Sequence, residues 1–114
     1  TVTGEMVRSK SESLIYMYLH INHIPFRYDA ALQLGQVTYY PDFTIRHPKT
    51  GEIFYWEHFG MMDDMEYAER TVQKIAAYEK NDYFQGENLI LTYETGRSPI
   101  NQKSVMRIVE RYLK

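Results

Sequence analysis

Two extended segments joined by a short turn constrain the fold of this chain more than any other feature. Residues 39–45 read YYPDFTI and residues 53–59 read IFYWEHF. Both runs are rich in the aromatic and β-branched residues that favour strands, and Pro48 and Gly51 between them are turn formers. We therefore expect a β-hairpin with strands over residues 37–46 and 52–59.

Each strand of this hairpin carries one carboxylate inside its apolar run, Asp42 in the first and Glu57 in the second. A buried carboxylate costs several kcal/mol unless a cation or strong donors compensate it. Because side chains alternate across a strand, Asp42 and Glu57 converge if the faces that carry them coincide. Two such oxygen ligands suit Mg²⁺ or Mn²⁺. The other interpretation of Asp42 is that Pro41-Asp42 begins a turn at a strand edge.

The rest of the pattern surrounds this hairpin with helices and two more strands. Ser9 to Asn22 has a capping box, Ser9 followed by Glu12, and then a helical apolar stripe. A helix after Asp63 and Asp64 runs to about residue 80, with Met65 and Val72 in its expected core stripe. Strands are expected over 26–34 and 88–93 and a last helix over 102–113. The order predicts an α/β sandwich around one mixed four-stranded sheet.

Composition limits the protein classes that this chain can belong to. Its 114 residues are enough for one domain, 1–114, and 44% are hydrophobic, as in globular proteins. No apolar run approaches the roughly 20 residues that cross a bilayer, so we expect no membrane partner. The absence of cysteine fits a reducing compartment, and we expect a cytoplasmic protein. The chain begins at Thr1, and we expect it to be the C-terminal fragment of a longer protein.

Charge is distributed unevenly along the chain. Residues 97–114 hold five basic side chains against one acidic one, a net of +4, whereas residues 1–96 have a net of −6. Within the last helix, cations at helical spacing form one stripe that could neutralise phosphates: Lys103, Arg107 and Arg111. The alternative is an ordinary solvated helix face.

Glu12 and Lys74 are the other candidates for chemistry. Glu12 lies on the helix face that should meet the sheet, where it could act as a third acidic group. Alternatively it serves only the capping box with Ser9. Lys74 follows Tyr67 and Thr71 along one line of its helix, from which it could stabilise a developing negative charge. Most helix lysines are instead solvated.

Pro41-Asp42, Glu57 fifteen residues later, the upstream Glu12 and this order of elements together resemble the PD-(D/E)XK nuclease superfamily. The likeness covers residues from about 8 to 93 and implies the restriction-endonuclease-like αβββαβ core. It implies that Asp42 and Glu57 bind divalent metal and that Glu12 assists. The family's lysine, two residues after the second acid, corresponds to Phe59, which can supply no charge. Because some members carry this lysine on the next helix, the likeness points to Lys74 as its replacement.

Three hypotheses follow from these residues. The first is a Mg²⁺- or Mn²⁺-dependent nuclease that hydrolyses phosphodiester bonds, in DNA, with Glu12, Asp42, Glu57 and Lys74 as catalytic residues. The second is a degenerate nuclease fold that binds nucleic acid or a protein partner, which Phe59 favours. The third is a structural interaction domain whose carboxylates pair with Arg27, Arg46 or Lys74. They differ in metal binding and in cleavage.

Overall fold

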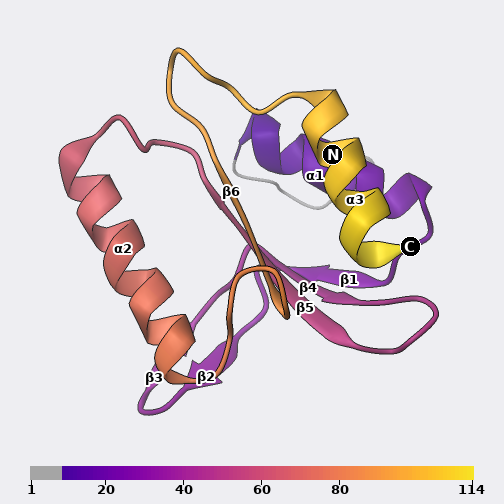
Figure 1. Ribbon diagram of the computed structural model, residues 1–114, viewed down its shortest axis with the longest axis horizontal. Helices are drawn as coiled ribbons and strands as arrows, with labels where there is room; N and C mark the ends of the chain where they lie inside the picture. The colour runs from indigo at the N-terminus through magenta and orange to yellow at the C-terminus, as the bar shows by residue number, and fades with distance from the viewer. Residues whose placement is uncertain (1–8) are drawn as a thin grey trace.

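The computed structural model describes residues 9–114, so residues 1–8 of the expected domain lie outside the described part. The chain forms a mixed α/β fold in which three helices flank a four-stranded sheet (Figure 1). The elements in chain order are α1 (Lys10–Ile21), β1 (Phe26–Tyr28), β2 (Leu32–Leu34), β3 (Val37–Tyr39), β4 (Phe43–Arg46), β5 (Ile53–Phe59), α2 (Met65–Lys80), β6 (Leu89–Tyr93) and α3 (Gln102–Leu113).

The main sheet has the strand order β1-β4-β5-β6. Strands β1, β4 and β5 are antiparallel neighbours, whereas β6 runs parallel to β5. The parallel pair follows from the crossover through α2, because a strand that returns by a helix enters the sheet in the same direction. The expected mixed four-stranded sheet and the β4–β5 hairpin are therefore confirmed.

Two of the expected strands are wrong in their extent, because each divides into two. The segment 26–34 breaks into β1 and β2, and the segment 37–46 breaks into β3 and β4. Asp29 adopts a left-handed backbone with φ of 58°, which turns the chain out of the main sheet, and Pro41 has no N–H to give to a ladder. The inner halves, β2 and β3, pair as a separate antiparallel hairpin that turns at Gly35.

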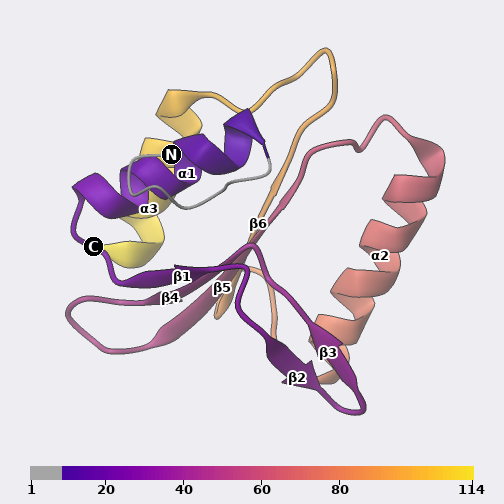
Figure 2. The same cartoon turned by 180° about the vertical axis from the view of Figure 1, so that it is seen from behind.

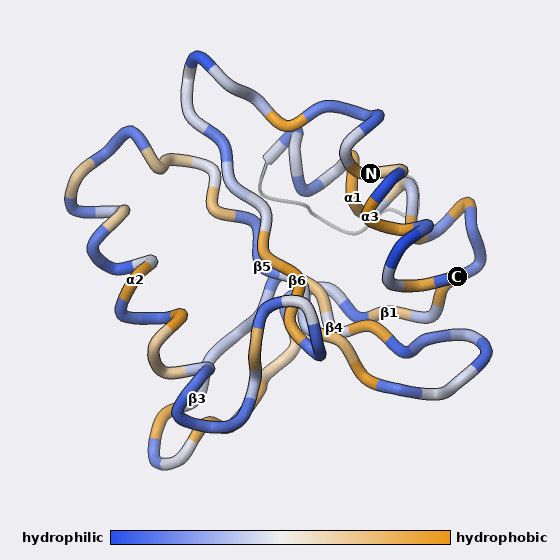
Figure 3. Tube along the Cα trace, in the orientation of Figure 1, coloured by the Kyte–Doolittle hydropathy of each residue, from blue (hydrophilic) through white to orange (hydrophobic). Residues whose placement is uncertain are grey.

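The sheet separates two hydrophobic clusters. On one face α1 and α3 lie side by side and pack on strand residues such as Phe43, Trp56 and Ile90. On the other face α2 and the β2–β3 hairpin enclose Leu34 and Tyr78 (Figure 2). The apolar colour concentrates where β5 and β6 pass between these layers (Figure 3). The molecule thus has the expected three-layer arrangement.

Helix α1 begins as its sequence predicts. Ser9 is the N-cap, and its Oγ accepts a hydrogen bond from the backbone N–H of Glu12 at 3.1 Å. Ile15 and Leu19 are fully buried one turn apart against the sheet. This places Glu12 on the same inward side, one turn before Ile15. No helix in residues 9–114 has the length and apolarity that crossing a membrane requires.

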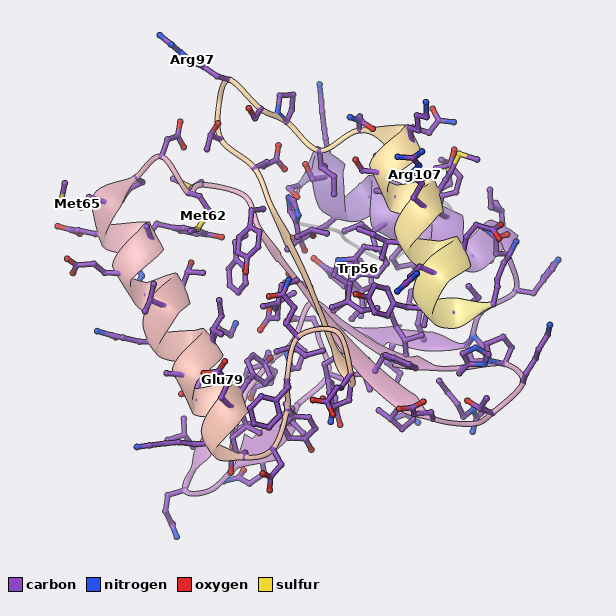
Figure 4. All side chains as sticks on the ribbon, in the orientation of Figure 1. Trp56, Met62, Met65, Glu79, Arg97 and Arg107 are labelled. Carbon is purple, nitrogen blue, oxygen red and sulfur yellow. The ribbon has the colours of Figure 1, made fainter. Side chains whose placement is uncertain are left out.

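The core stripe expected for α2 is wrong at Met65 and Val72, whereas Ile75, which belongs to the same stripe, is half-buried and packs against the cluster around Tyr78. Met65 and Val72 are 80% and 65% exposed, and Figure 4 shows Met65 at the outer start of the helix. Thr71 and Tyr78 are buried instead. The helix therefore turns its Tyr67–Thr71–Lys74–Tyr78 line toward the sheet, because the tyrosine rings supply the apolar contact and Glu57 offers a partner to the polar groups.

Candidate active site

A cavity of about 200 Å³ lies where β5 ends and β4 begins, between α1 and α2. All four residues that the sequence singled out for catalysis line it. Its complete lining is Glu12, Tyr40, Asp42, Glu57, His58, Phe59, Tyr67 and Lys74. Four separate segments of the chain therefore deliver polar groups to one small space.

The two carboxylates meet there because of the β4–β5 register. Phe43 lies opposite Trp56, so continuing the antiparallel pairing by one residue puts Asp42 opposite Glu57. Both are buried, with 6% and 2% of their surface exposed. The expectation that these side chains converge at one cavity is confirmed. Asp42 lies just before β4, at the strand edge and not inside the strand that we expected to contain it. Its Oδ2 accepts a hydrogen bond from the backbone N–H of His58 at 2.7 Å.

Glu57 has two partners on α2. Its Oε2 lies 2.7 Å from Lys74 Nζ and accepts a hydrogen bond from the Tyr78 hydroxyl, also at 2.7 Å. Such compensation is what a buried carboxylate requires, since an isolated charge in this position would be strongly destabilising. Lys74 is 28% exposed, so its ammonium reaches Glu57 and still borders the cavity. The lysine is therefore not a purely solvated helix residue.

The hydroxyl groups of Tyr78 and Tyr67, near the site, are held in their neutral form. Burial, together with the negative charge of Glu57, raises the pKa of Tyr78 far above its ordinary value. Burial also raises the pKa of Tyr67, and the nearby charge of Lys74 only partly opposes this. Deprotonating either hydroxyl beside Asp42 and Glu57 would add a further negative charge. Tyr78 therefore remains a neutral donor to Glu57, and Tyr67, whose hydroxyl accepts from the backbone N–H of Gly60, remains a neutral part of the cavity wall.

Glu12 takes part in the helix cap and in the cavity at once. Its Oε1 accepts a hydrogen bond from the Tyr28 hydroxyl at 2.6 Å, and its Oε2 lies 3.4 Å from Ser9 Oγ. The carboxylate is 9% exposed and lines the same space as Asp42. The backbone N–H of Glu12 thus takes part in the helix cap, and its side chain lines the candidate cavity.

Phe59, the residue at which the sequence resemblance would require a lysine, is 5% exposed. Its ring is stacked on Tyr93, with 5.7 Å between ring centroids. A cation at this position would be buried among aromatic rings close to the Lys74 ammonium. Among residues 9–114, the cation that lines this cavity is Lys74 of α2.

A polar chain beside the cavity was missed by the sequence reasoning. His58 Nε2 lies 2.5 Å from Glu94 Oε1, and the Ser11 hydroxyl donates to the same carboxylate oxygen. His58 Nδ1 lies 2.8 Å from Thr92 Oγ1. Burial alone would raise the pKa of Glu94, but the hydrogen bonds from Ser11 and His58 and the charge of His58 hold it below its ordinary value. Through Ser11, this series of hydrogen bonds fixes the start of α1, and hence Glu12, to the ends of β5 and β6.

The cavity offers fewer protein ligands than a complete coordination shell of a divalent cation requires. No group of three or more His, Asp or Glu residues that could hold a metal ion is found within residues 9–114. Magnesium is, however, commonly bound through one or two carboxylates, with water and substrate phosphates completing the octahedron. Asp42 and Glu57 supply those two carboxylates, in a cavity lined mainly by polar groups. The residues therefore fit a cation that shares its coordination with water and substrate.

The basic stripe of the last helix lies outside this cavity. Lys103, Arg107 and Arg111 border a shallow surface hollow on α3, together with Met106 and Glu110. The opposite side of the helix is buried through Val105, Val109 and Leu113. Figure 4 shows α3, with Arg107 labelled, on the sheet face away from α2. The structure therefore separates this stripe from the lysine of the candidate site.

A comparison with models of protein families finds no match to this chain, and a comparison with curated proteins finds none either.

Proposed function

We propose that this chain is a metal-dependent nuclease domain that hydrolyses phosphodiester bonds, in DNA. One observation carries the proposal: Glu12, Asp42, Glu57 and Lys74, which come from four segments of the chain, line the same cavity. Three carboxylates beside a lysine are costly for folding, and their grouping at a concave surface is typical of a catalytic site.

Asp42 and Glu57 are the residues that would hold the cation. When bound, Mg²⁺ or Mn²⁺ polarises a phosphoryl oxygen and lowers the pKa of an attacking water. Tyr78 and the backbone N–H of His58 orient the two carboxylates before any ligand arrives. Because the carboxylates are already oriented, they do not have to rearrange when the ligand binds.

Lys74 and Glu12 supply the remaining polar groups. Lys74 carries the positive charge at the cavity wall, so it can attract a phosphate and stabilise the charge that grows on it during hydrolysis. Glu12, held by the Tyr28 hydroxyl, supplies an acceptor that can orient a water molecule. Each role uses a side chain that already lines the cavity.

A second candidate function is nucleic-acid binding without cleavage. It is favoured by Phe59 at the superfamily's lysine position and by the ion pair that already neutralises Glu57. The third hypothesis, a structural domain, rests on that ion pair and on the hydrogen bonds that Glu12 and Asp42 accept.

The test is nicking of supercoiled plasmid DNA in Mg²⁺ or Mn²⁺. We expect Asp42→Asn, Glu57→Gln and Lys74→Met each to lower the rate about 100-fold or more. Lys80→Met is the matched control, because Lys80 is an exposed lysine on the same helix that does not line the cavity. Its rate should equal that of the wild type. A wild type that binds DNA but does not nick it, at any metal concentration, overturns the nuclease in favour of the binding module.

A further inference from the structure

A second and larger cavity borders the candidate active site. Its volume is about 430 Å³, against about 200 Å³ for the first. The two share Phe59, Tyr67 and Lys74 as lining residues. The two cavities therefore adjoin each other along these three side chains.

The walls of the second cavity are aromatic and cationic. Tyr39 enters from the β2–β3 hairpin, Phe59 from the end of β5 and Tyr67 from α2. Arg70 and Gln73 add a guanidinium and an amide from exposed positions on α2. The lining described within residues 9–114 contains two cations and no carboxylate. This differs sharply from the neighbouring cavity, which holds three carboxylates.

The rings are fixed by contacts with neighbouring groups of the protein. The backbone N–H of Gly60 donates to the Tyr67 hydroxyl at 3.0 Å, and the Arg70 guanidinium lies 5.9 Å from the centre of the Tyr67 ring. Phe59 is stacked on Tyr93, and the Tyr39 ring lies 6.2 Å from that of Tyr78. A flat ligand therefore meets surfaces that lose little conformational freedom when it binds.

We propose that this second cavity binds an unpaired nucleobase, so that the substrate is a single-stranded segment of DNA. The proposal rests on the proposed function, since the base belongs to the nucleotide beside the phosphate in the carboxylate cavity. Aromatic rings stack on any base through its π-face, and arginine adds a cation–π contact and hydrogen bonds to the base edge. Gln73 offers both a donor and an acceptor to that edge.

A base inside intact duplex DNA cannot occupy such a cavity. Its faces are covered by neighbouring bases and its pairing edge is used by the opposite strand. For such a base to reach the rings, it would first have to be unstacked and unpaired. This costs free energy in a duplex, and the cost is smallest for a base that is already single-stranded. The cavity therefore favours single strands, frayed ends or flaps over continuous duplex.

The first experiment measures binding of a fluorescent 12-nucleotide single strand by anisotropy, in EDTA so that nothing is cleaved. The same oligomer annealed to its complement, and its RNA counterpart, form the other arms. We expect the single strand to bind at least tenfold more tightly than the duplex. Tighter binding of RNA than of DNA supports the base-binding cavity but identifies its ligand as single-stranded RNA. Equal affinity for single strand and duplex overturns the proposal.

Two exposed residues allow this cavity to be altered without disturbing the core. Arg70 and Gln73 are exposed residues of α2. Because alanine is a good helix former, Arg70→Ala and Gln73→Ala should leave the helix intact. We expect Arg70→Ala to weaken single-strand binding about tenfold. Arg97→Ala is the matched control, because it removes the same charge from an exposed arginine that projects away from the molecule (Figure 4). Equal losses in Arg70→Ala and Arg97→Ala overturn the proposal, since only net charge would then matter.

Photochemical crosslinking then locates the base. An oligomer with 5-iodouracil at single positions is bound, irradiated and mapped by mass spectrometry. We expect crosslinks to Tyr39, Phe59 or Tyr67. Crosslinks confined to the α3 segment, 102–113, overturn the base-binding cavity.

The outcomes also separate this proposal from the proposed function. If Asp42→Asn abolishes nicking while single-strand binding stays within about twofold of wild type, both proposals stand. If the wild type binds single strands through Arg70 but never cleaves, the cavity stands and the nuclease fails. If it cleaves in an Asp42-dependent manner and Arg70→Ala has no effect on binding, the nuclease stands and the cavity fails.

Discussion

Replacing Lys74 by methionine tests whether the buried Glu57 depends on its cation. Methionine keeps an unbranched apolar stem of similar length, so the packing of α2 is largely preserved while the charge is lost. The Lys74 Nζ and Glu57 Oε2 atoms lie 2.7 Å apart, and the carboxylate side chain is 2% exposed. The variant therefore leaves a buried negative charge with the Tyr78 hydroxyl as its remaining partner on α2.

The size of the effect follows from the exposure of the two partners. Removing one member of a fully buried ion pair costs about 3–5 kcal/mol, and breaking an exposed pair costs about 0–1 kcal/mol. The Lys74 side chain is 28% exposed, so water can partly solvate the space that its ammonium leaves. We expect the free energy of unfolding to fall by about 2–3 kcal/mol.

The assay is urea denaturation in EDTA, followed by circular dichroism, on Lys74→Met, Glu57→Gln and the double variant. The double variant should be less destabilised than the sum of the single variants, with a coupling energy of about 2 kcal/mol. Lys80→Met is the control and should change the free energy of unfolding by less than about 1 kcal/mol. A Lys74→Met variant as stable as the wild type, or a coupling energy of zero, refutes the ion pair.

Three further predictions concern Tyr78, Glu94 and the basic stripe of α3. Tyr78→Phe should lower the free energy of unfolding by about 1.5–3 kcal/mol, since it removes a buried hydrogen bond to the charged Glu57; urea denaturation checks this. The pKa of Glu94 is below its ordinary value of 4.5, so its charged form stabilises the fold above that pH and the contribution is lost as the pH falls through the folded pKa. Glu94→Gln should therefore be less stable than the wild type at pH 7 and lose that difference in acid, as thermal unfolding against pH will show; a difference that persists unchanged to pH 3 contradicts the assignment. If α3 contacts phosphates, replacing its three cations by glutamine should reduce the slope of log affinity for duplex DNA against log salt by about 2–3, and an unchanged slope makes the stripe a solvated face. The replaced residues are Lys103, Arg107 and Arg111.

The helices and the main sheet were predictable because their signals are local. The capping Ser9, the acidic start of α2 and the apolar run of β6 each lie within or directly before the element they define. The division of the two long strands was not predictable in this way. It depends on a left-handed Asp29 and on pairing of β2 with β3, which a continuous extended pattern does not reveal.

The buried face of α2 shows how tertiary contacts override hydrophobic periodicity. Met65 and Val72 have the spacing of a core stripe, yet both are exposed. The line through Tyr67 and Tyr78 is buried because two tyrosine rings cover more apolar area than one methionine and one valine, and because Glu57 requires donors. The signal in the sequence for this buried face was Glu57 on β5, because its carboxylate required partners from the facing helix.

The candidate site was partly visible in the sequence. Asp42 and Glu57 stood out as charges inside apolar strands, and the register of β4 and β5 brings them to one cavity. The chain through His58 and Glu94 did not stand out, because its contacts join residues 36 and 83 positions apart. The available signal was parallel pairing of β5 with β6, which puts His58 opposite Thr92 and therefore close to Glu94.

Calorimetric titration of Mn²⁺ into the wild type, Asp42→Ala and Glu57→Ala, with plasmid nicking followed on the same samples, tests the proposed metal nuclease most directly. We expect binding to the wild type, and the loss of both binding and nicking in each variant, because the two carboxylates supply the protein ligands. Circular dichroism on each sample confirms that the variants are folded. Metal binding without nicking contradicts catalysis and favours the nucleic-acid-binding module, and a folded wild type that binds no Mn²⁺ contradicts the metal site itself.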